Sequence, residues 1–193
     1  MQRLPSDVLT DPAYRVPEPE PGETGMAWLR GHVVRFCEGQ EHARRRAQTQ
    51  AVIDGIVDTP FIASATRSLL AAFGLPEELA ADVTLASAAY QPHAPQSAEA
   101  DNAADRLVAA CGGRSEQAAS RVCVLVQADA ACTALAERIR AASTDPPLTA
   151  TRRITPTGEQ VEVDLADAHF GRGAHRCPGE ALATRLARQQ AQR

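Results

Sequence analysis

The sequence contains no lysine, and all twenty of its cationic side chains are arginines in a chain of 193 residues. Chemistry that needs a lysine amine, such as Schiff-base formation or phosphate binding by a P-loop, is therefore excluded. Aromatic residues are scarce at 4%, so the core must be built mainly from Ala, Val and Leu. Because Ala and Leu have high helix propensity, this composition favours helices.

The sequence also lacks the patterns of several kinds of site and segment. Its five cysteines include no CxxC pair, which argues against a structural zinc site and against a disulfide framework. No apolar run approaches the length of a membrane span, and the start MQRLPSDVLT has no signal pattern. The net charge of −4 argues against a nucleic-acid-binding protein. We expect a cytoplasmic protein that binds neither nucleic acid nor membrane.

The organisation along the chain is an extended lead-in followed by one domain. Residues 1–25 hold five prolines and are predicted to be extended, and residues 26–193 are predicted to form a single domain. Apolar spacing and the placement of Gly, Pro and Ser predict six helices, over residues 26–37, 40–57, 60–73, 77–90, 98–111 and 115–142. The segments LTATRRI and QVEVDL flank the turn TPTG and predict a β-hairpin, and ALATRLARQQAQ predicts a last helix. The fold class is mainly α.

The segment FGRGAHRCPGE, residues 170–180, places one cysteine among glycines, beside a histidine and arginines. Its three glycines allow tight turns and a close approach to a flat ligand. Pro178 suits the first position of a helix, which predicts Cys177 at a helix N-terminus, where backbone N–H groups lower the pKa of a thiol. Such a thiolate serves as a nucleophile, a redox sensor or a single axial ligand to iron.

This segment resembles the haem-binding loop of the cytochromes P450, Phe-Gly-x-Gly-x-His-x-Cys-x-Gly. The six specified residues all match, as Phe170, Gly171, Gly173, His175, Cys177 and Gly179. The resemblance implies that the cofactor is haem b and that Cys177 is the metal ligand, donating electron density to the iron that favours O–O cleavage. It also implies that His175 faces a haem propionate and that Phe170 shields the sulfur.

Two further segments are similar to the propionate-binding residues of the family. In GQEHARRR, His42 and Arg46 share one helix face and resemble the His-x-x-x-Arg of the family's C helix, although an exposed polar face would give the same spacing. In PPLTATRRI, Arg153 follows the Pro-Pro pair as the family's propionate-binding arginine does, with Arg152 as the second choice. Strand residues alternate between faces, so only one of the two can point inward.

The segment RVCVLVQADAACTALAERI resembles the family's I helix, which carries an acid and a threonine for oxygen activation. Thr133 is the candidate catalytic alcohol, and Asp129, one turn earlier, is the candidate acid because Cys132 directly precedes the threonine. A buried helix with an incidental threonine is the alternative. Glu137 and Arg140 spell the family's Glu-x-x-Arg, but they follow without the expected break, so a helical ion pair is the alternative there.

The resemblance implies a reduced P450-like helical fold with one small β-hairpin and a cysteine haem loop. It implies a haem-thiolate oxidoreductase, a monooxygenase of a small organic substrate such as a bacterial secondary metabolite, served by a ferredoxin-type electron donor. The alternatives are a peroxide-using or redox-neutral haem enzyme and a non-catalytic partner-binding module. The chain is short for this family and leaves no room for the N-terminal sheet or the lid helices. We therefore expect an oligomer or a partner protein to cover its apolar faces.

Overall fold

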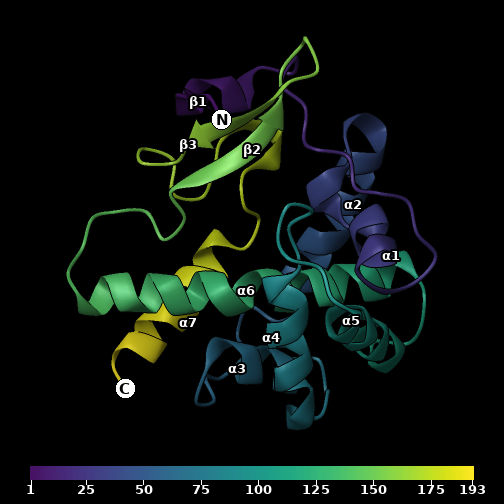
Figure 1. The fold of residues 1–193 in the computed structure, drawn as a ribbon. Helices are drawn as coiled ribbons and strands as arrows, with labels where there is room; N and C mark the ends of the chain where they lie inside the picture. Colours follow the sequence, from purple (N-terminus) through teal and green to yellow (C-terminus); the bar gives the residue numbers. More distant parts are fainter.

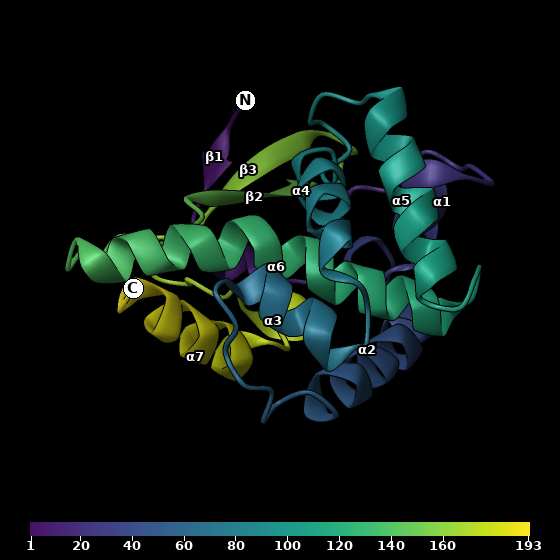
Figure 2. The same cartoon turned by 90° about the horizontal axis from the view of Figure 1, so that it is seen from below.

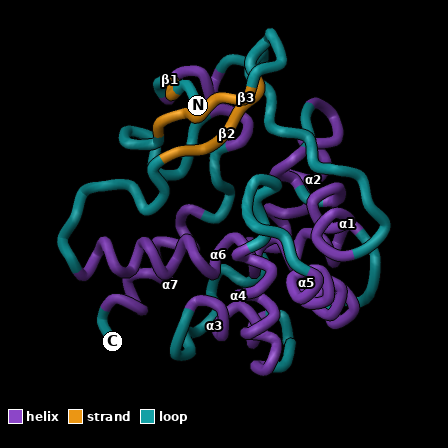
Figure 3. The backbone as a smooth tube through the Cα atoms, in the orientation of Figure 1, coloured by secondary structure: helices purple, strands orange, loops and turns teal.

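The computed structural model describes residues 1–193 and is mainly helical (Figure 1). Its seven α-helices are α1 (Gly25–His32), α2 (Gly39–Asp54), α3 (Ala65–Ala72), α4 (Ala80–Ala88), α5 (Ala98–Ala110), α6 (Glu116–Arg140) and α7 (Glu180–Ala191). The strands are β1 (Arg3–Leu4), β2 (Ala150–Ile154) and β3 (Gln160–Asp164). The strands lie together at one end of the molecule, and most of the helices form the rest (Figure 3).

Helix α6 organises the helical part, because it packs against each of the other six α-helices. It crosses the molecule between α4 on one side and α7 on the other (Figure 2). The Oγ of Ser115 accepts a hydrogen bond from the N–H of Ala118 and caps its first turn. By length and composition alone α6 could also cross a membrane, and half of its most apolar stretch is buried inside the fold.

The main core contains mostly small and branched aliphatic side chains. Thirty buried residues form it, and Trp28, Phe36 and Tyr90 are its only aromatic members. Alanines and cysteines of α6 fill the space that large side chains would otherwise take. This follows from the low aromatic content, and it lets neighbouring helices approach α6 closely.

The sheet contains one strand more than the predicted hairpin. Strands β2 and β3 pair antiparallel as expected, and Gly158 in the turn between them has a φ of +88°. The additional strand β1 comes from the lead-in and pairs in parallel with β3. On the other edge of the hairpin, Arg15 exchanges two backbone hydrogen bonds with Ile154. The lead-in therefore covers both edges of the hairpin, and the expectation that no N-terminal strand is present was wrong.

The predicted helices are confirmed in number and order, with shifted ends. Helix α3 starts at residue 65 rather than 60, because Ser64 caps it by accepting from the N–H of Arg67. Helix α1 ends at His32 rather than at residue 37, because Val33 is extended (φ −99°, ψ 158°) before a short 3-10 turn. Both differences come from local backbone geometry that apolar spacing does not encode.

Candidate functional site

The cysteine loop joins the sheet to helix α7. The N–H of Cys177 donates to the carbonyl of Phe170 at 2.8 Å and closes the loop. Gly171 has a φ of +74°, a left-handed conformation that favours glycine. Helix α7 starts at Glu180, with Gly179 as its N-cap, so Pro178 precedes the helix instead of opening it. The predicted position of the proline was therefore wrong by two residues.

Gly173 makes a close approach, but to the protein's own lead-in. A Cβ at this position would lie 2.5 Å from the carbonyl oxygen of Leu9 and 3.3 Å from the Cα of Thr10. Both atoms belong to the 3-10 turn Ser6–Thr10 or to its immediate end. The sequence suggested that the loop glycines lie close to a flat ligand. Gly173 instead lies close to the backbone of Leu9 and Thr10. This contact docks the lead-in onto the cysteine loop.

Cys177 is the only exposed cysteine of the five. The other four are buried, namely Cys37, Cys111, Cys123 and Cys132. Burial of the thiol by surrounding protein nevertheless raises the pKa of Cys177, against the opposing effects of a hydrogen bond from the Gly179 N–H and the charge of Arg46. The predicted lowering of its pKa was wrong in net direction, although the predicted N–H donor is present.

Two thiols of α6 lie within electrostatic range of Cys177. Burial is the main cause that raises the pKa of Cys123 to about 11 and that of Cys132 to about 12, and the charge of Cys177 contributes to both. Cys123 lies next to the hydroxyl of Tyr90, 3.4 Å from its sulfur. Cys132 lies 4.0 Å from the carbonyl of Ala183, so this part of α6 packs against the start of α7, directly after the cysteine loop.

We expect one fast-reacting thiol out of five when the folded protein is treated with a thiol reagent. The pKa is raised at all five thiols, but four of them are buried, so only Cys177 is accessible to the reagent. Quantitative labelling with a disulfide reagent checks this. The fast phase should disappear in Cys177→Ala and persist in Cys111→Ala. Rapid labelling of two or more thiols in the folded protein would contradict the structure.

Histidines and arginines gather behind the loop. The ring of His42, on α2, lies 4.1 Å from that of His175 between centroids. The His175 Nε2 lies 3.0 Å from an oxygen of Glu38, whose other oxygen accepts from the N–H of Val16 at 2.8 Å. Arg46, one turn after His42, donates to the carbonyl of Arg176. The structure thus brings together the predicted residues of α2 and of the loop.

Arg153 approaches the same cluster from β2. Its side chain is 3% exposed, and its one hydrogen bond goes to the carbonyl of Arg152 at 2.8 Å. Burial lowers the pKa of Arg153 to about 10, and the charge of Glu38 opposes this. Arg152 lies on the opposite strand face and donates to Gln160 at 3.1 Å. Of the two arginines, Arg153 is the one that points inward.

The cluster fits a group with carboxylates at its edge. The Nε2 of His42 is buried and has no hydrogen-bond partner. A buried polar atom without a partner costs free energy, which a ligand acceptor would recover. Arg153 and Arg46 supply guanidinium donors that match a carboxylate. No group of three His, Cys, Asp or Glu side chains is placed to hold a bare metal ion, so a metal here needs a prosthetic group besides Cys177.

The α6 candidates lie apart from this cluster. Asp129 accepts a hydrogen bond from the hydroxyl of Thr66, on α3, at 2.5 Å. Thr133 is exposed and lies 3.5 Å from Gln190, near the end of α7. The structure does not bring either side chain to Cys177, and their catalytic role stays a prediction.

The Glu-x-x-Arg segment at the end of α6 forms no ion pair. Glu137 is exposed, and Arg140 donates instead to the carbonyl of Gln190 at 2.6 Å. Because α6 runs without a break to Arg140, both residues lie on its exposed last turn. The helical ion pair considered from the sequence is therefore absent.

Glu38 is the site residue that the sequence analysis missed. Its two oxygens join the lead-in, through Val16, to the cysteine loop, through His175. These two bonds, together with the charge of Arg153, act against burial and lower the pKa of Glu38. An acidic residue directly before a helix is usually explained by the helix dipole, and this ordinary explanation concealed its contact with the loop.

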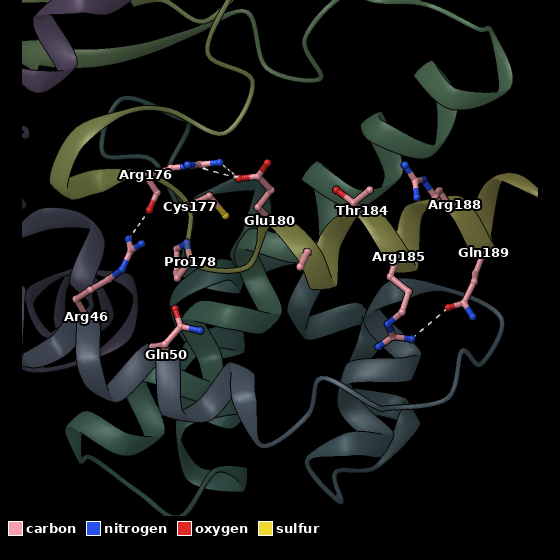
Figure 4. Close-up of a pocket in the computed structure, with 11 residues that line it drawn as sticks. Arg46, Gln50, Arg176, Cys177, Pro178, Glu180, Thr184, Arg185, Arg188 and Gln189 are labelled. Carbon is pink, nitrogen blue, oxygen red and sulfur yellow. Dashed lines mark hydrogen bonds and ion pairs between the residues drawn. The ribbon is translucent and has the colours of Figure 1, made fainter.

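An open cleft of about 740 Å³ lies between α2, the cysteine loop and α7, and Cys177 and Pro178 are part of its lining (Figure 4). Its lining is rich in arginine and includes Arg46, Arg176, Arg185 and Arg188. Arg176 is paired with Glu180, and Arg185 donates to Gln189 (Figure 4). A flat apolar ligand has little to contact here, whereas an acidic surface has several cations.

Comparison with solved structures identifies the fold. The structure is similar to P450BioI, solved in complex with hexadec-9Z-enoic acid ligated acyl carrier protein, with a TM-score of 0.68 and 15% identity over 96% of this chain and 81% of that one. It is also similar to ligand-free CYP105P1, with a TM-score of 0.50 and 15% identity over 96% of this chain and 78% of that one. No protein-family model matches the chain, and no curated protein matches it.

Proposed function

We propose that this chain, whose fold is that of the bacterial cytochromes P450, is a cytoplasmic haem-thiolate oxidoreductase. The fold confirms the resemblance that the motifs indicated. The observation that carries the functional proposal is the position of Cys177, in a closed loop before α7, next to a cluster of cations and a partnerless histidine. An apoprotein without a carboxylate-bearing ligand has no evident use for that combination.

Each residue of the cluster has a role in this proposal. Cys177 would ligate the iron of haem b as a thiolate, and the haem would supply the redox chemistry. The Gly179 N–H and the charge of Arg46 stabilise the thiolate at its sulfur. His42 and Arg153 would bind haem carboxylates, and Phe170, whose carbonyl closes the loop, would shield the sulfur from water.

We propose a monooxygenase reaction on a small organic substrate. A peroxide-using or redox-neutral reaction is the second candidate, and one observation favours it. Asp129 and Thr133, the candidates for proton delivery to oxygen, are hydrogen-bonded to Thr66 and Gln190, away from Cys177. An enzyme that uses peroxide has less need for such delivery.

The arginine-rich cleft supports a proposal about partners. An acidic protein such as a ferredoxin-type donor would meet Arg46, Arg176, Arg185 and Arg188 next to the cysteine loop. The similar protein P450BioI was solved with an acyl carrier protein, so a carrier protein is a second kind of partner for this chain. A second copy of the chain is the third, because large apolar side chains such as Leu85 and Leu148 are exposed.

The proposal is tested by the ferrous–CO difference spectrum of protein supplied with haem. We expect stoichiometric haem binding and a strongly red-shifted Soret band, because the thiolate is the axial ligand. The band should be lost in Cys177→Ala and retained in Cys111→Ala, whose thiol is buried at the end of α5. A wild-type protein without this band would refute the haem-thiolate proposal and would favour a non-catalytic partner-binding module.

A further inference from the structure

Three arginines are buried, namely Arg30, Arg45 and Arg153, and Arg35 is half-buried; Arg30 and Arg45 each have several acceptors. Arg30 donates to the carbonyls of Tyr90 and Ala89 and to Gln96. Arg45 forms ion pairs with Glu41 and Glu116. These two guanidinium groups have the acceptors that burial requires. Arg30 and Arg45 therefore show how a buried arginine with a purely structural role is paired in this protein.

Arg35 and Arg153 have fewer acceptors than Arg30 and Arg45. Arg35 donates one side-chain hydrogen bond, to the hydroxyl of Thr151 at 2.7 Å, and Arg153 donates one, to a backbone carbonyl. Neither forms an ion pair, although a guanidinium has five N–H donors. Most of the donor capacity of both side chains is therefore unused.

The two arginines share one face of β2. Thr151 and Arg153 are two residues apart on the strand, so their side chains project from the same face. The hydrogen bond from Arg35 to Thr151 places the Arg35 guanidinium on that face as well. Burial lowers the pKa of Arg153, and the charge of Arg35 lowers it further, as expected for neighbouring cations.

The carboxylate already present offsets the charge of Arg153 only in part and forms no ion pair with either arginine. Glu38 lies near Arg153, but its oxygens are used by the N–H of Val16 and by His175. Two like charges close together lower stability, and none of their unused nitrogens is among the fully buried atoms without a partner, so these donors are open to an added ligand. Arg35 and Arg153 thus repel each other without a bound anion, and a planar carboxylate would accept from both.

We propose that Arg35 and Arg153 form a carboxylate-binding pair on this face of β2, with Arg35 as a binding residue that the family motifs do not indicate. Arg35 lies toward α6, because its charge acts on Tyr90 and on Cys123 of that helix. Arg153 lies toward the cysteine loop, because its charge acts on Glu38 and His175. The pair spans the interval between the loop and α6.

The bound carboxylate has two sources, either the edge of a porphyrin or a free organic acid used as substrate. The first source rests on the proposed function, and the second would narrow the substrate class to carboxylic acids. Iron-free mesoporphyrin IX and its dimethyl ester test the first, because they differ only in the carboxylates. Decanoate and decanol test the second in the same way.

The test compares the wild type with Arg35→Gln and with the control Arg152→Gln. Arg152 lies on the same strand but faces Gln160, so its loss removes one cation without affecting the pair. Porphyrin binding is measured by fluorescence titration and decanoate binding by calorimetry. We expect Arg35→Gln to bind at least one of the two acids about tenfold or more weakly, the loss typical of a charge-assisted hydrogen bond. Its affinity for the ester or alcohol should stay unchanged.

A weaker mesoporphyrin affinity identifies the porphyrin edge as the source, and a weaker decanoate affinity identifies a free acid. Wild-type affinity of Arg35→Gln for both acids would overturn the pair, and so would a wild-type protein that binds neither acid. Arg35→Gln removes the charge that repels Arg153, so this variant should melt at or above the melting temperature of the wild type. Arg35→Lys keeps the charge without the planar fork and should bind with intermediate affinity. If Arg35→Gln does not fold, wild-type affinity of Arg35→Lys for both acids overturns the proposal.

The two proposals fail separately in these experiments. Iron-free mesoporphyrin cannot be ligated through iron, so its binding does not depend on Cys177. An absent ferrous–CO band together with Arg35-dependent binding of either acid would refute haem-thiolate chemistry and leave the carboxylate pair standing. A ferrous–CO band together with acid binding that does not depend on Arg35 would refute the carboxylate pair alone.

Discussion

Replacing Gly173 with alanine is expected to lower the free energy of unfolding by roughly 2–4 kcal/mol. The residue has a φ of +65°, so any Cβ is strained there. In addition, that Cβ would lie 2.5 Å from the Leu9 carbonyl oxygen, which is backbone and cannot rotate away. The lead-in turn must therefore separate from the cysteine loop. Urea unfolding followed by circular dichroism measures the loss.

Gly74 provides a matched control for this substitution. Its φ of +67° is nearly the same, but a Cβ there would have no atom within 4 Å. Gly74→Ala should therefore cost only the backbone strain, about 1–2 kcal/mol. The difference between the two variants isolates the contact between the loop and the lead-in. Equal losses in the two variants would show that this contact contributes nothing to stability.

Acidification of the haem-free protein from about pH 6.5 to pH 4 should remove roughly 2–3 kcal/mol of stability through His175. Burial lowers the pKa of His175 to about 4, and the hydrogen bond with Glu38 only partly opposes this. The unfolded chain therefore binds a proton in this window before the folded chain does. Stability is complete above the ordinary histidine pKa, and it falls until the folded pKa is reached. The figure allows for solvent that reaches the ring.

The variant His175→Gln keeps an N–H donor for Glu38 but cannot titrate. Its unfolding free energy should fall less steeply between pH 6.5 and pH 4 than that of the wild type. His169 is exposed and lies in the same loop, so His169→Gln is the control and should retain the wild-type slope. Identical slopes in the wild type and in His175→Gln would exclude His175 as the source of the acid sensitivity.

The helices and the cysteine loop were predictable from sequence because their signals are local. Apolar spacing and caps such as Ser115 indicated α6, and the six loop residues all lie within one short segment. Strand alternation indicated that only one of Arg152 and Arg153 points inward, and the resemblance to the family's Pro-Pro segment selected Arg153. These features depend on neighbours along the chain, and patterns of neighbouring residues express them directly.

What could not be predicted depends on contacts between distant segments. The pairing of β1 with β3 joins residues at opposite ends of the chain, and β1 is too short to show alternation. Glu38 reaches the loop across 137 positions of sequence, and Arg35 meets Thr151 across 116. The net pKa of Cys177 depends on burial by the whole fold, which outweighed the local N–H donor.

The pairing of β1 with β3 also determines when the sheet can be completed during synthesis of the protein. Strand β1 leaves the ribosome well before β3, because β3 is translated only from residue 160 onward. At ordinary rates of elongation the nascent lead-in must wait roughly 10 to 30 seconds without its partner. Helix α7 and the cysteine loop emerge later still. Insertion of a cofactor that needs the completed cysteine loop would therefore have to wait until that loop has emerged, after the whole sheet.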